Sequence, residues 1–139
     1  MRQQLHTIRI RTTGPNLYEF TDQAIRWLKE TGIERGLLTV YVRHTSASLV
    51  IQENADPDVR RDLVAFFRRL VPDGDPLFVH TIEGPDDMPA HAKAALTQVS
   101  LSIPVADGLP VLGAWQGLYL FEHRRAPHTR NVVLHVMGE

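Results

Sequence analysis

The last third of the sequence predicts β-strands and no helix, and this constrains the fold most. Its strand-like segments are rich in β-branched and aromatic side chains and cover residues 99–103, 115–123 and 131–136. The helices that we expect all lie earlier in the chain, over residues 16–31, 57–70 and 89–96. Because strands and helices do not alternate regularly, the order disfavours a doubly wound parallel sheet. We predict an α+β fold with an antiparallel or mixed sheet and about three helices.

The ends of the predicted helices are marked by specific residues. Gly32 stands where the C-terminal glycine of the first helix belongs. Before the second helix, Asp56 supplies a capping carboxylate, Pro57 suits the first turn, and Asp58 is favoured by the helix dipole. In the last third, Asp107-Gly108 is typical of a hairpin turn.

Shorter strands are expected in the first half of the chain. Ile8 and Ile10 alternate with polar neighbours and predict a first strand that ends at the turn 14–15. Residues 37–44 predict a second strand, and residues 49–51 predict its hairpin partner.

Composition excludes several classes of function. The 139 residues form a single predicted domain, 1–139, and include no cysteine, which excludes disulfide scaffolds, thiolate catalysis and sulfur-bound zinc. The formal net charge of −1 argues against a nucleic-acid partner bound through bulk positive charge. No apolar run approaches the roughly 18 residues of a membrane span, and the first residues do not resemble a signal peptide. We expect a cytoplasmic protein with no nucleic-acid or membrane partner and no organic cofactor.

The first candidate segment, His44-Thr45-Ser46-Ala47-Ser48, follows a predicted strand. Its hydroxyls and backbone amides lack bulk and suit a phosphate or a carboxylate. The alternative is a tight turn in which the side chains bond their own backbone. Thr45, Ser46 and Ser48 are candidate substrate-binding residues, and His44 is a candidate catalytic residue.

Polar residues also gather before the second helix. Asn54 and Asp56 lie where side chains can hold a ligand group or a cation, so both are candidate substrate-binding residues. Capping of the helix alone is the simpler interpretation of Asp56.

The densest polar segment runs from His80 to His91 and holds two histidines and three acids around a Gly-Pro loop. Imidazole and carboxylate groups bind zinc, manganese or magnesium. The spacing matches no recognised zinc motif, and acids beside a helix start are often solvated caps. The candidate metal ligands are His80, Glu83, Asp86 and His91.

A glycine-rich segment precedes the strand 115–123. Glycine beside or within a strand often marks the close approach of a ligand or of another backbone, so Gly113 and Gln116 are candidate substrate-binding residues. Glu122 and His123 end this strand and point to opposite faces, so we do not expect them to pair.

Three aromatic residues, Trp115, Tyr119 and Phe121, share one face of the same strand. An aromatic row of this kind favours a core or a subunit interface over a platform for ligand stacking.

These segments together resemble the YjbQ-like family, often labelled secondary thiamine-phosphate synthase. The matching segments occur in order across nearly the full length, at 44–49, 53–59, 83–91, 102–104, 113–119, 122–124 and 138–139. The chain departs from the family pattern at Ala114, where a hydroxyl residue is expected, and in the loop at 127–128.

The resemblance implies a compact, sandwich-like α+β domain that forms a homotrimer. It also implies condensation of a hydroxymethylpyrimidine diphosphate with a thiazole phosphate, as a secondary activity beside an open physiological substrate. A small-molecule phosphate substrate fits the hydroxyl-rich segment and the arginines 124 and 125. A diphosphate leaving group fits a divalent ion such as Mg²⁺ or Zn²⁺.

Two hypotheses therefore stay open. In an enzyme, the candidate catalytic residues are His44, His91, Glu122 and Arg124. The two histidines would act as acid–base groups or ligands, and Arg124 would stabilise charge. In a non-catalytic homotrimer, the same residues would bind a metabolite or a metal. Both hypotheses expect His44, His80 and His91 to converge in one pocket at or near a subunit boundary.

Overall fold

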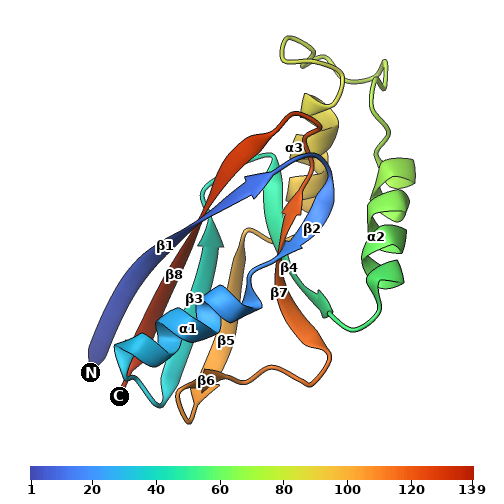
Figure 1. Ribbon diagram of the computed structural model, residues 1–139. Helices are drawn as coiled ribbons and strands as arrows, with labels where there is room; N and C mark the ends of the chain where they lie inside the picture. Colours follow the sequence, from blue (N-terminus) through green and yellow to red (C-terminus); the bar gives the residue numbers. More distant parts are fainter.

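The computed structural model describes residues 1–139 as two antiparallel sheets and three helices (Figure 1). In chain order the elements are β1 (Arg2–Thr12), β2 (Asn16–Glu19), α1 (Thr21–Thr31), β3 (Gly36–Val42), β4 (Ala47–Glu53), α2 (Pro57–Leu70), α3 (Asp87–Leu96), β5 (Ser100–Ala106), β6 (Leu109–Pro110), β7 (Gln116–Glu122) and β8 (His128–Gly138). The larger sheet has the order β1-β8-β3-β5-β6, and the smaller sheet has the order β2-β7-β4. The predicted α+β fold with three helices is confirmed, and no strand pair is parallel.

The main core lies between the two sheets and α1. Alternate residues of β3, such as Leu38 and Val40, point into it, and Leu118 and Leu120 of β7 meet them from the smaller sheet. Leu28 belongs to the stripe of α1 that closes this core. Burial of these side chains is the main source of stability at this chain length.

A second, smaller core lies on the opposite face of the smaller sheet, beneath α2. Tyr119 and Phe121 are buried there, and the Phe67 ring of α2 meets the Phe121 ring edge to face at 5.2 Å between centroids. Of the two predicted alternatives for Tyr119 and Phe121, the core is therefore correct and the subunit interface is wrong, because α2 of the same chain covers them. Trp115 alone of the three aromatic residues is exposed, at 66%.

The predicted helix 16–31 begins five residues too early. Residues 16–19 form β2 and pair with the end of β7, which leaves Leu17 in the small core. The helix starts at Thr21, whose Oγ1 accepts a hydrogen bond from the Leu118 amide at 2.8 Å. Its end is as predicted, since Gly32 adopts the left-handed conformation with φ 72°.

The predicted hairpin between residues 37–44 and 49–51 does not form. β4 pairs with β7 in the smaller sheet, and β3 pairs with β5 and β8 in the larger sheet. Residues 43–46 carry the chain from one sheet to the other. Ala47 and Leu49 of β4 face the main core while Val50 faces α2, so both faces of the strand are covered.

The strand register and α3 decide which residues meet at each end of the smaller sheet. Ala47 pairs with Glu122 at one end, and Glu53 pairs with Gln116 at the other. α3 packs against β4, and the loop 71–86 before it projects beyond the Glu122 end (Figure 1). None of the three helices is long and apolar enough to cross a membrane.

Candidate functional site

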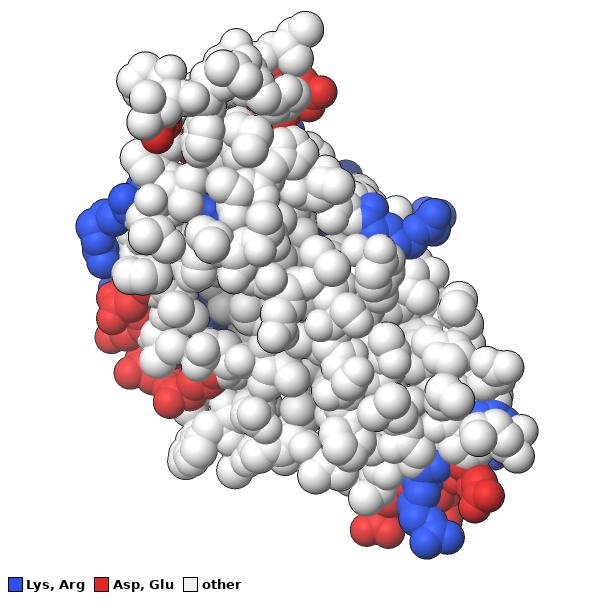
Figure 2. Space-filling view, turned by 180° about the vertical axis from the view of Figure 1, so that it is seen from behind, with Lys and Arg blue, Asp and Glu red and all other residues white.

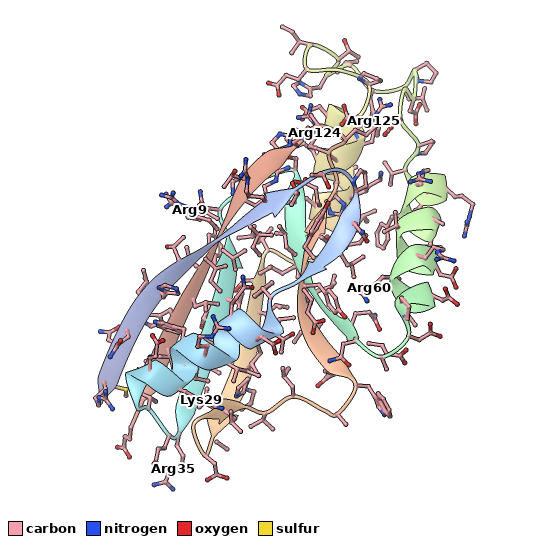
Figure 3. All side chains as sticks on the ribbon, viewed as in Figure 1. Arg9, Lys29, Arg35, Arg60, Arg124 and Arg125 are labelled. Carbon is pink, nitrogen blue, oxygen red and sulfur yellow. The ribbon has the colours of Figure 1, made fainter.

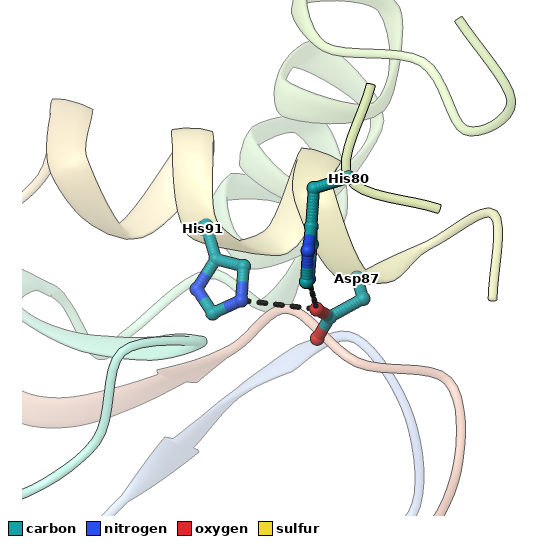
Figure 4. A group of neighbouring side chains, drawn as sticks. All are labelled: His80, Asp87 and His91. Carbon is teal, nitrogen blue, oxygen red and sulfur yellow. Dashed lines mark hydrogen bonds and ion pairs between the residues drawn. The ribbon is translucent and has the colours of Figure 1, made fainter. Parts of the chain in front are cut away.

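Three side chains meet where the loop 71–86 enters α3, and we call them the histidine–aspartate cluster: His80, Asp87 and His91 (Figure 4). Asp87 and His91 stand one helical turn apart on α3 and so share a face. The Asp87 Oδ2 atom lies 2.7 Å from His80 Nε2 and 3.0 Å from His91 Nε2. One atom from each residue is available as a ligand, and these atoms all lie within 4.8 Å of one another.

The cluster is open to solvent on its histidine side. The Asp87 side chain is 2% exposed, whereas the side chains of His80 and His91 are 39% and 30% exposed. An ion or a ligand can therefore reach the imidazoles while the carboxylate stays fixed beneath them.

The hydrogen bonds of His91 create an electrostatic conflict inside the cluster. Its Nδ1 lies 2.9 Å from the carbonyl oxygen of Thr45, which only accepts, so Nδ1 carries the proton and donates. In a neutral imidazole Nε2 then holds a lone pair and faces the carboxylate oxygen of Asp87 at 3.0 Å. Either a second proton on His91 or a metal ion shared by the two atoms relieves this repulsion. Histidines that bind metals commonly donate their other N–H to a backbone carbonyl in this way.

Arg124 holds the carboxylate of Asp87 in place. Its Nη1 donates to Asp87 Oδ1 at 2.6 Å and its Nε donates to Asp86 Oδ2 at 3.1 Å. Burial alone would raise the pKa of Asp87, but the hydrogen bond from His80 and the neighbouring His91 and Arg124 lower that pKa below its ordinary value. Asp87 is thus an ionised, positioned carboxylate.

Only two of the four predicted metal ligands lie in the cluster. His80 and His91 lie together, with ring centroids 5.7 Å apart, but the acid beside them is Asp87. The Asp86 carboxylate accepts from Arg124 and from the Arg125 amide, and Glu83 is exposed and touches Arg124 only through its backbone carbonyl.

No hydrogen bond joins His44 to His80 or His91, and His44 and His80 line different surface hollows, so the predicted convergence is confirmed for His80 and His91 only. His44 Nε2 accepts a hydrogen bond from the Asn131 amide at 2.8 Å. Burial and the charge of Arg130 lower the pKa of His44. A neutral imidazole whose acceptor nitrogen is already engaged can donate but cannot take up a proton, which favours a structural role. The next residue, Thr45, provides the link to the cluster through its carbonyl.

Glu122 belongs to a second, fully buried group that the sequence did not indicate, because its partner Arg130 lies on the next strand. Arg130 binds it in a bidentate manner, with Nε to Oε1 at 2.7 Å and Nη2 to Oε2 at 2.5 Å. Thr12 donates to Glu122 Oε1, and Ser46 Oγ accepts from Arg130 Nη2. Burial would raise the pKa of Glu122, but the bonds from Arg130 and Thr12 lower it.

Ser48 also lies inside the protein. Its Oγ is 2.9 Å from His123 Nε2 and 2.6 Å from the hydroxyl of Thr97, beyond the end of α3. Burial together with the charges of Lys93 and Arg130 outweighs the raising effect of Glu122 and lowers the pKa of His123 to about 3. His123 is therefore a neutral imidazole at physiological pH.

The remaining predicted substrate-binding residues lie at the other end of the smaller sheet. Gln116 pairs with Glu53 in the register, six residues from the Glu122 end, which corresponds to roughly 20 Å along a strand. There the Gly113 backbone amide donates to Gln116 Oε1, and the Asn54 backbone amide donates to the backbone carbonyl of Trp115. Asp56 caps α2 by accepting from the Asp58 amide at 2.9 Å. The predicted substrate set thus divides into two distant groups.

A family model described as "UPF0047 protein YjbQ-like" matches residues 6–139. The chain belongs to the YjbQ-like family.

Two relatives in this YjbQ-like family match over almost their whole length. The UPF0047 protein sll1880 of Synechocystis is 50% identical over 138 residues, covering 99% of this chain and 94% of the relative. The UPF0047 protein YjbQ of Escherichia coli O157:H7 is 39% identical over 138 residues, covering 99% and 98%.

Solved structures agree with the fold. A YjbQ/UPF0047 family protein from Clostridium acetobutylicum aligns with a TM-score of 0.87 at 31% identity, covering 95% of this chain and 99% of that one. The hypothetical protein APE1520 from Aeropyrum pernix aligns with a TM-score of 0.86 at 32% identity, and both chains are covered completely. Membership in the YjbQ-like family and these structural alignments therefore establish the fold.

Proposed function

We propose that this YjbQ-like protein is a metal-assisted enzyme acting on phosphate-bearing small molecules, with thiamine-phosphate synthase-like condensation as one reaction. The observation that carries the proposal is the histidine–aspartate cluster, in which two solvent-facing imidazoles share one buried carboxylate oxygen. A bound divalent ion would neutralise the diphosphate that leaves in such a condensation.

The donor set favours zinc over magnesium. Two imidazole nitrogens and one carboxylate oxygen are typical of catalytic zinc, which keeps its fourth position for water or substrate. Magnesium prefers oxygen ligands and retains several waters. His80, Asp87 and His91 would therefore hold Zn²⁺, with the Thr45 carbonyl orienting His91 and Arg124 orienting Asp87.

The working form of the enzyme is proposed to be a homotrimer built on the outer face of the larger sheet. The outward side chains of its three central strands carry no formal charge: Leu37, Thr39, Tyr41, Ser100, Ser102, Pro104, Asn131, Val133, His135 and Met137. Figure 2 shows a broad, largely uncharged surface on this side, with Lys, Arg, Asp and Glu gathered along its edges. Depletion of charge is typical of the buried centre of a protein interface.

The cluster adjoins one end of this face. Tyr41, His44, Thr45 and Val99 line a surface hollow of about 470 Å³, and the Thr45 carbonyl binds His91. A second copy seated on the face would border this hollow, which supports a site near the subunit boundary. The exposed Leu77, Val79 and Ile82 of the loop 71–86 offer further apolar contact area.

The condensation assay supplies the test. The zinc-loaded protein is incubated with the pyrimidine diphosphate and the thiazole phosphate, and released pyrophosphate is measured. We expect release that Asp87→Asn abolishes and that an exposed control, Asp22→Asn on α1, preserves. Wild-type release no faster than that of Asp87→Asn would contradict the enzymatic proposal. Light scattering at the 15.7 kDa monomer mass would contradict the trimer.

One observation favours a second candidate function, a non-catalytic homotrimer that binds a metal or a metabolite. His44 and Glu122, two of the predicted catalytic groups, are engaged in structural hydrogen bonds. If zinc binds tightly to the cluster while no pyrophosphate appears, the binding function is the correct one.

A further inference from the structure

We propose that a second pocket, between α2 and α3, binds the phosphate group of a small-molecule ligand. We call it the lysine pocket. It encloses about 170 Å³ and is lined by Val64, Arg68, Asp73, Lys93, His123 and Arg125. Lys93 and His91 are two residues apart on α3 and so face different sides of the helix, which separates this pocket from the histidine–aspartate cluster.

The main evidence is the unpaired charge of Lys93. This residue is 6% exposed, and its ammonium makes no hydrogen bond and no ion pair with the protein. The other buried charges are all paired, Asp86 and Asp87 with Arg124, and Glu122 with Arg130. No fully buried side-chain nitrogen lacks a partner, so the ammonium keeps its solvent contact through the pocket alone. A charge with so little solvent is poorly stabilised, and a ligand of opposite charge in the pocket would stabilise it.

The charge balance of the pocket specifies an anion. Three cations, Arg68, Lys93 and Arg125, line it against one acid. That acid, Asp73, is engaged by Arg125 Nε at 3.4 Å, and Lys93 is left free. The pocket therefore carries an excess of two positive charges, which matches the roughly −1.5 to −2 of a phosphate monoester at neutral pH.

His123 adds a polar group to the wall of the pocket. Its Nε2 is engaged by the Ser48 hydroxyl, which is in turn bonded to Thr97, so the ring orientation is fixed from behind. The other ring nitrogen has no partner in the protein and is available to a ligand oxygen. A fixed imidazole beside a buried ammonium is a preorganised pair of groups for an oxyanion.

The size of the pocket limits what enters it. A volume of about 170 Å³ lies below the roughly 300–1,000 Å³ of pockets that enclose a whole drug-sized ligand. An adjoining hollow of about 400 Å³ shares Val64 and Arg68 with the pocket and adds Arg60 and Arg61 of α2. A phosphomonoester fits this shape, with its phosphate beside Lys93 and its organic part along α2.

Direct binding of inorganic phosphate tests the lysine pocket. Titration calorimetry compares the full-length wild type with Lys93→Met, which keeps the length of the side chain and removes its charge. The matched control is Lys29→Met on α1, an exposed lysine on a different part of the molecule from Arg124 and Arg125 (Figure 3). We expect wild type and Lys29→Met to bind phosphate equally, and Lys93→Met to bind at least about tenfold more weakly.

Folding is monitored in parallel. Because Lys93→Met removes an unpaired buried charge, its melting temperature should equal or exceed that of wild type. If Lys93→Met does not fold, Arg68→Gln is used in its place. Arg68 lines the pocket at an exposed position, and the same loss of phosphate affinity is expected. Wild-type protein that binds no phosphate, or a Lys93→Met variant that binds it as tightly as wild type, would overturn the proposal.

Identification of the ligand as a substrate rests on the proposed function, whereas the binding site does not. Zinc affinity reports on the cluster alone and should be the same in Lys93→Met and wild type. Wild-type protein that releases pyrophosphate but binds no inorganic phosphate refutes the lysine pocket only. Phosphate binding without pyrophosphate release supports the pocket and refutes the enzymatic proposal.

Discussion

The histidine–aspartate cluster and the buried Glu122–Arg130 pair contain the same chemical groups but differ in how fully their hydrogen-bonding capacity is used. In each, an arginine holds a carboxylate and histidines lie close by. Both oxygens of Glu122 are saturated by donors from Thr12, Arg130 and two backbone amides, and its side chain is fully buried. Asp87 gives one oxygen to Arg124 and presents the other to two solvent-facing imidazoles.

This difference separates a structural ion pair from the binding site that we propose. A buried charge pair with every donor and acceptor used has nothing left to offer a ligand. The cluster retains a lone pair that faces a carboxylate, and a proton or a metal ion is needed to complete it. Incomplete hydrogen bonding beside a positioned carboxylate, rather than charge alone, is therefore the feature on which the proposed site at this end of the smaller sheet rests.

The largest effect on stability is expected from breaking the buried Glu122–Arg130 ion pair. Glu122→Gln leaves the Arg130 guanidinium buried without a counter-charge and should reduce the free energy of unfolding by about 3–5 kcal/mol. Urea denaturation at pH 7 measures this loss. Replacement of both partners by Met should recover most of it, since no charge then remains buried. A loss of less than about 1 kcal/mol in Glu122→Gln would contradict the description of Glu122 and Arg130 as a buried, fully hydrogen-bonded ion pair.

The open cluster should respond in the opposite manner, with lost binding and little lost stability. His91→Ala removes one of the three proposed metal ligands and should weaken Zn²⁺ binding by about 100-fold. Loss of a residue that only orients a ligand already costs about 10- to 100-fold, and loss of a ligand itself should cost at least as much as the upper value. Because the side chain is partly exposed, the free energy of unfolding without zinc should change by less than about 1 kcal/mol. His6→Ala, an exposed histidine on β1, is the control for both measurements. Equal zinc affinity in wild type and His91→Ala would contradict the metal site.

The pH dependence of stability distinguishes the buried neutral histidine from the exposed ones. The pKa of His123 is about 3 in the folded protein and 6.5 when unfolded, so the unfolded state binds the proton first. Stability is therefore complete above pH 6.5 and falls by about 1.4 kcal/mol per pH unit as the pH drops below that value. In His123→Phe, the slope of the unfolding free energy against pH should be smaller by about this amount between pH 6 and 5. The carboxylates Asp86, Asp87 and Glu122, whose pKa values are lowered, contribute only at more acidic pH. Parallel curves for the two proteins would contradict a neutral buried His123.

Sequence periodicity predicted the fold class because each helix and strand is defined by its own neighbours. Strand partners are set over longer distances, and so the pairing of β4 with β7 was predicted wrongly. In the site, His80 and His91 were found but Asp87 was passed over for Asp86, because α3 was expected to begin near Pro89. A helix that begins at Asp87 puts this residue and His91 on one face.

The residues that the sequence did not indicate have partners far along the chain. Arg130 contacts Ser46 across 84 residues, and His123 contacts Ser48 across 75. No local pattern carries such contacts, since they depend on which strands become neighbours. Lys93 was missed for a different reason, because a lysine on a short helix normally reaches solvent.

The smallest effect tests a residue whose local role the sequence did predict. Asp56 accepts a hydrogen bond from the Asp58 backbone amide at the start of α2. It lies at the end of the smaller sheet away from the histidine–aspartate cluster and the Glu122–Arg130 pair. Asp56→Ala should reduce the free energy of unfolding by about 1 kcal/mol, the usual value of an N-cap, and Asp56→Asn should cost less because its amide oxygen still accepts. Neither variant should alter zinc or phosphate affinity. A loss of affinity in Asp56→Ala that exceeds its loss of stability would instead connect this end of the sheet to the ligand and reunite the predicted substrate-binding residues in one site.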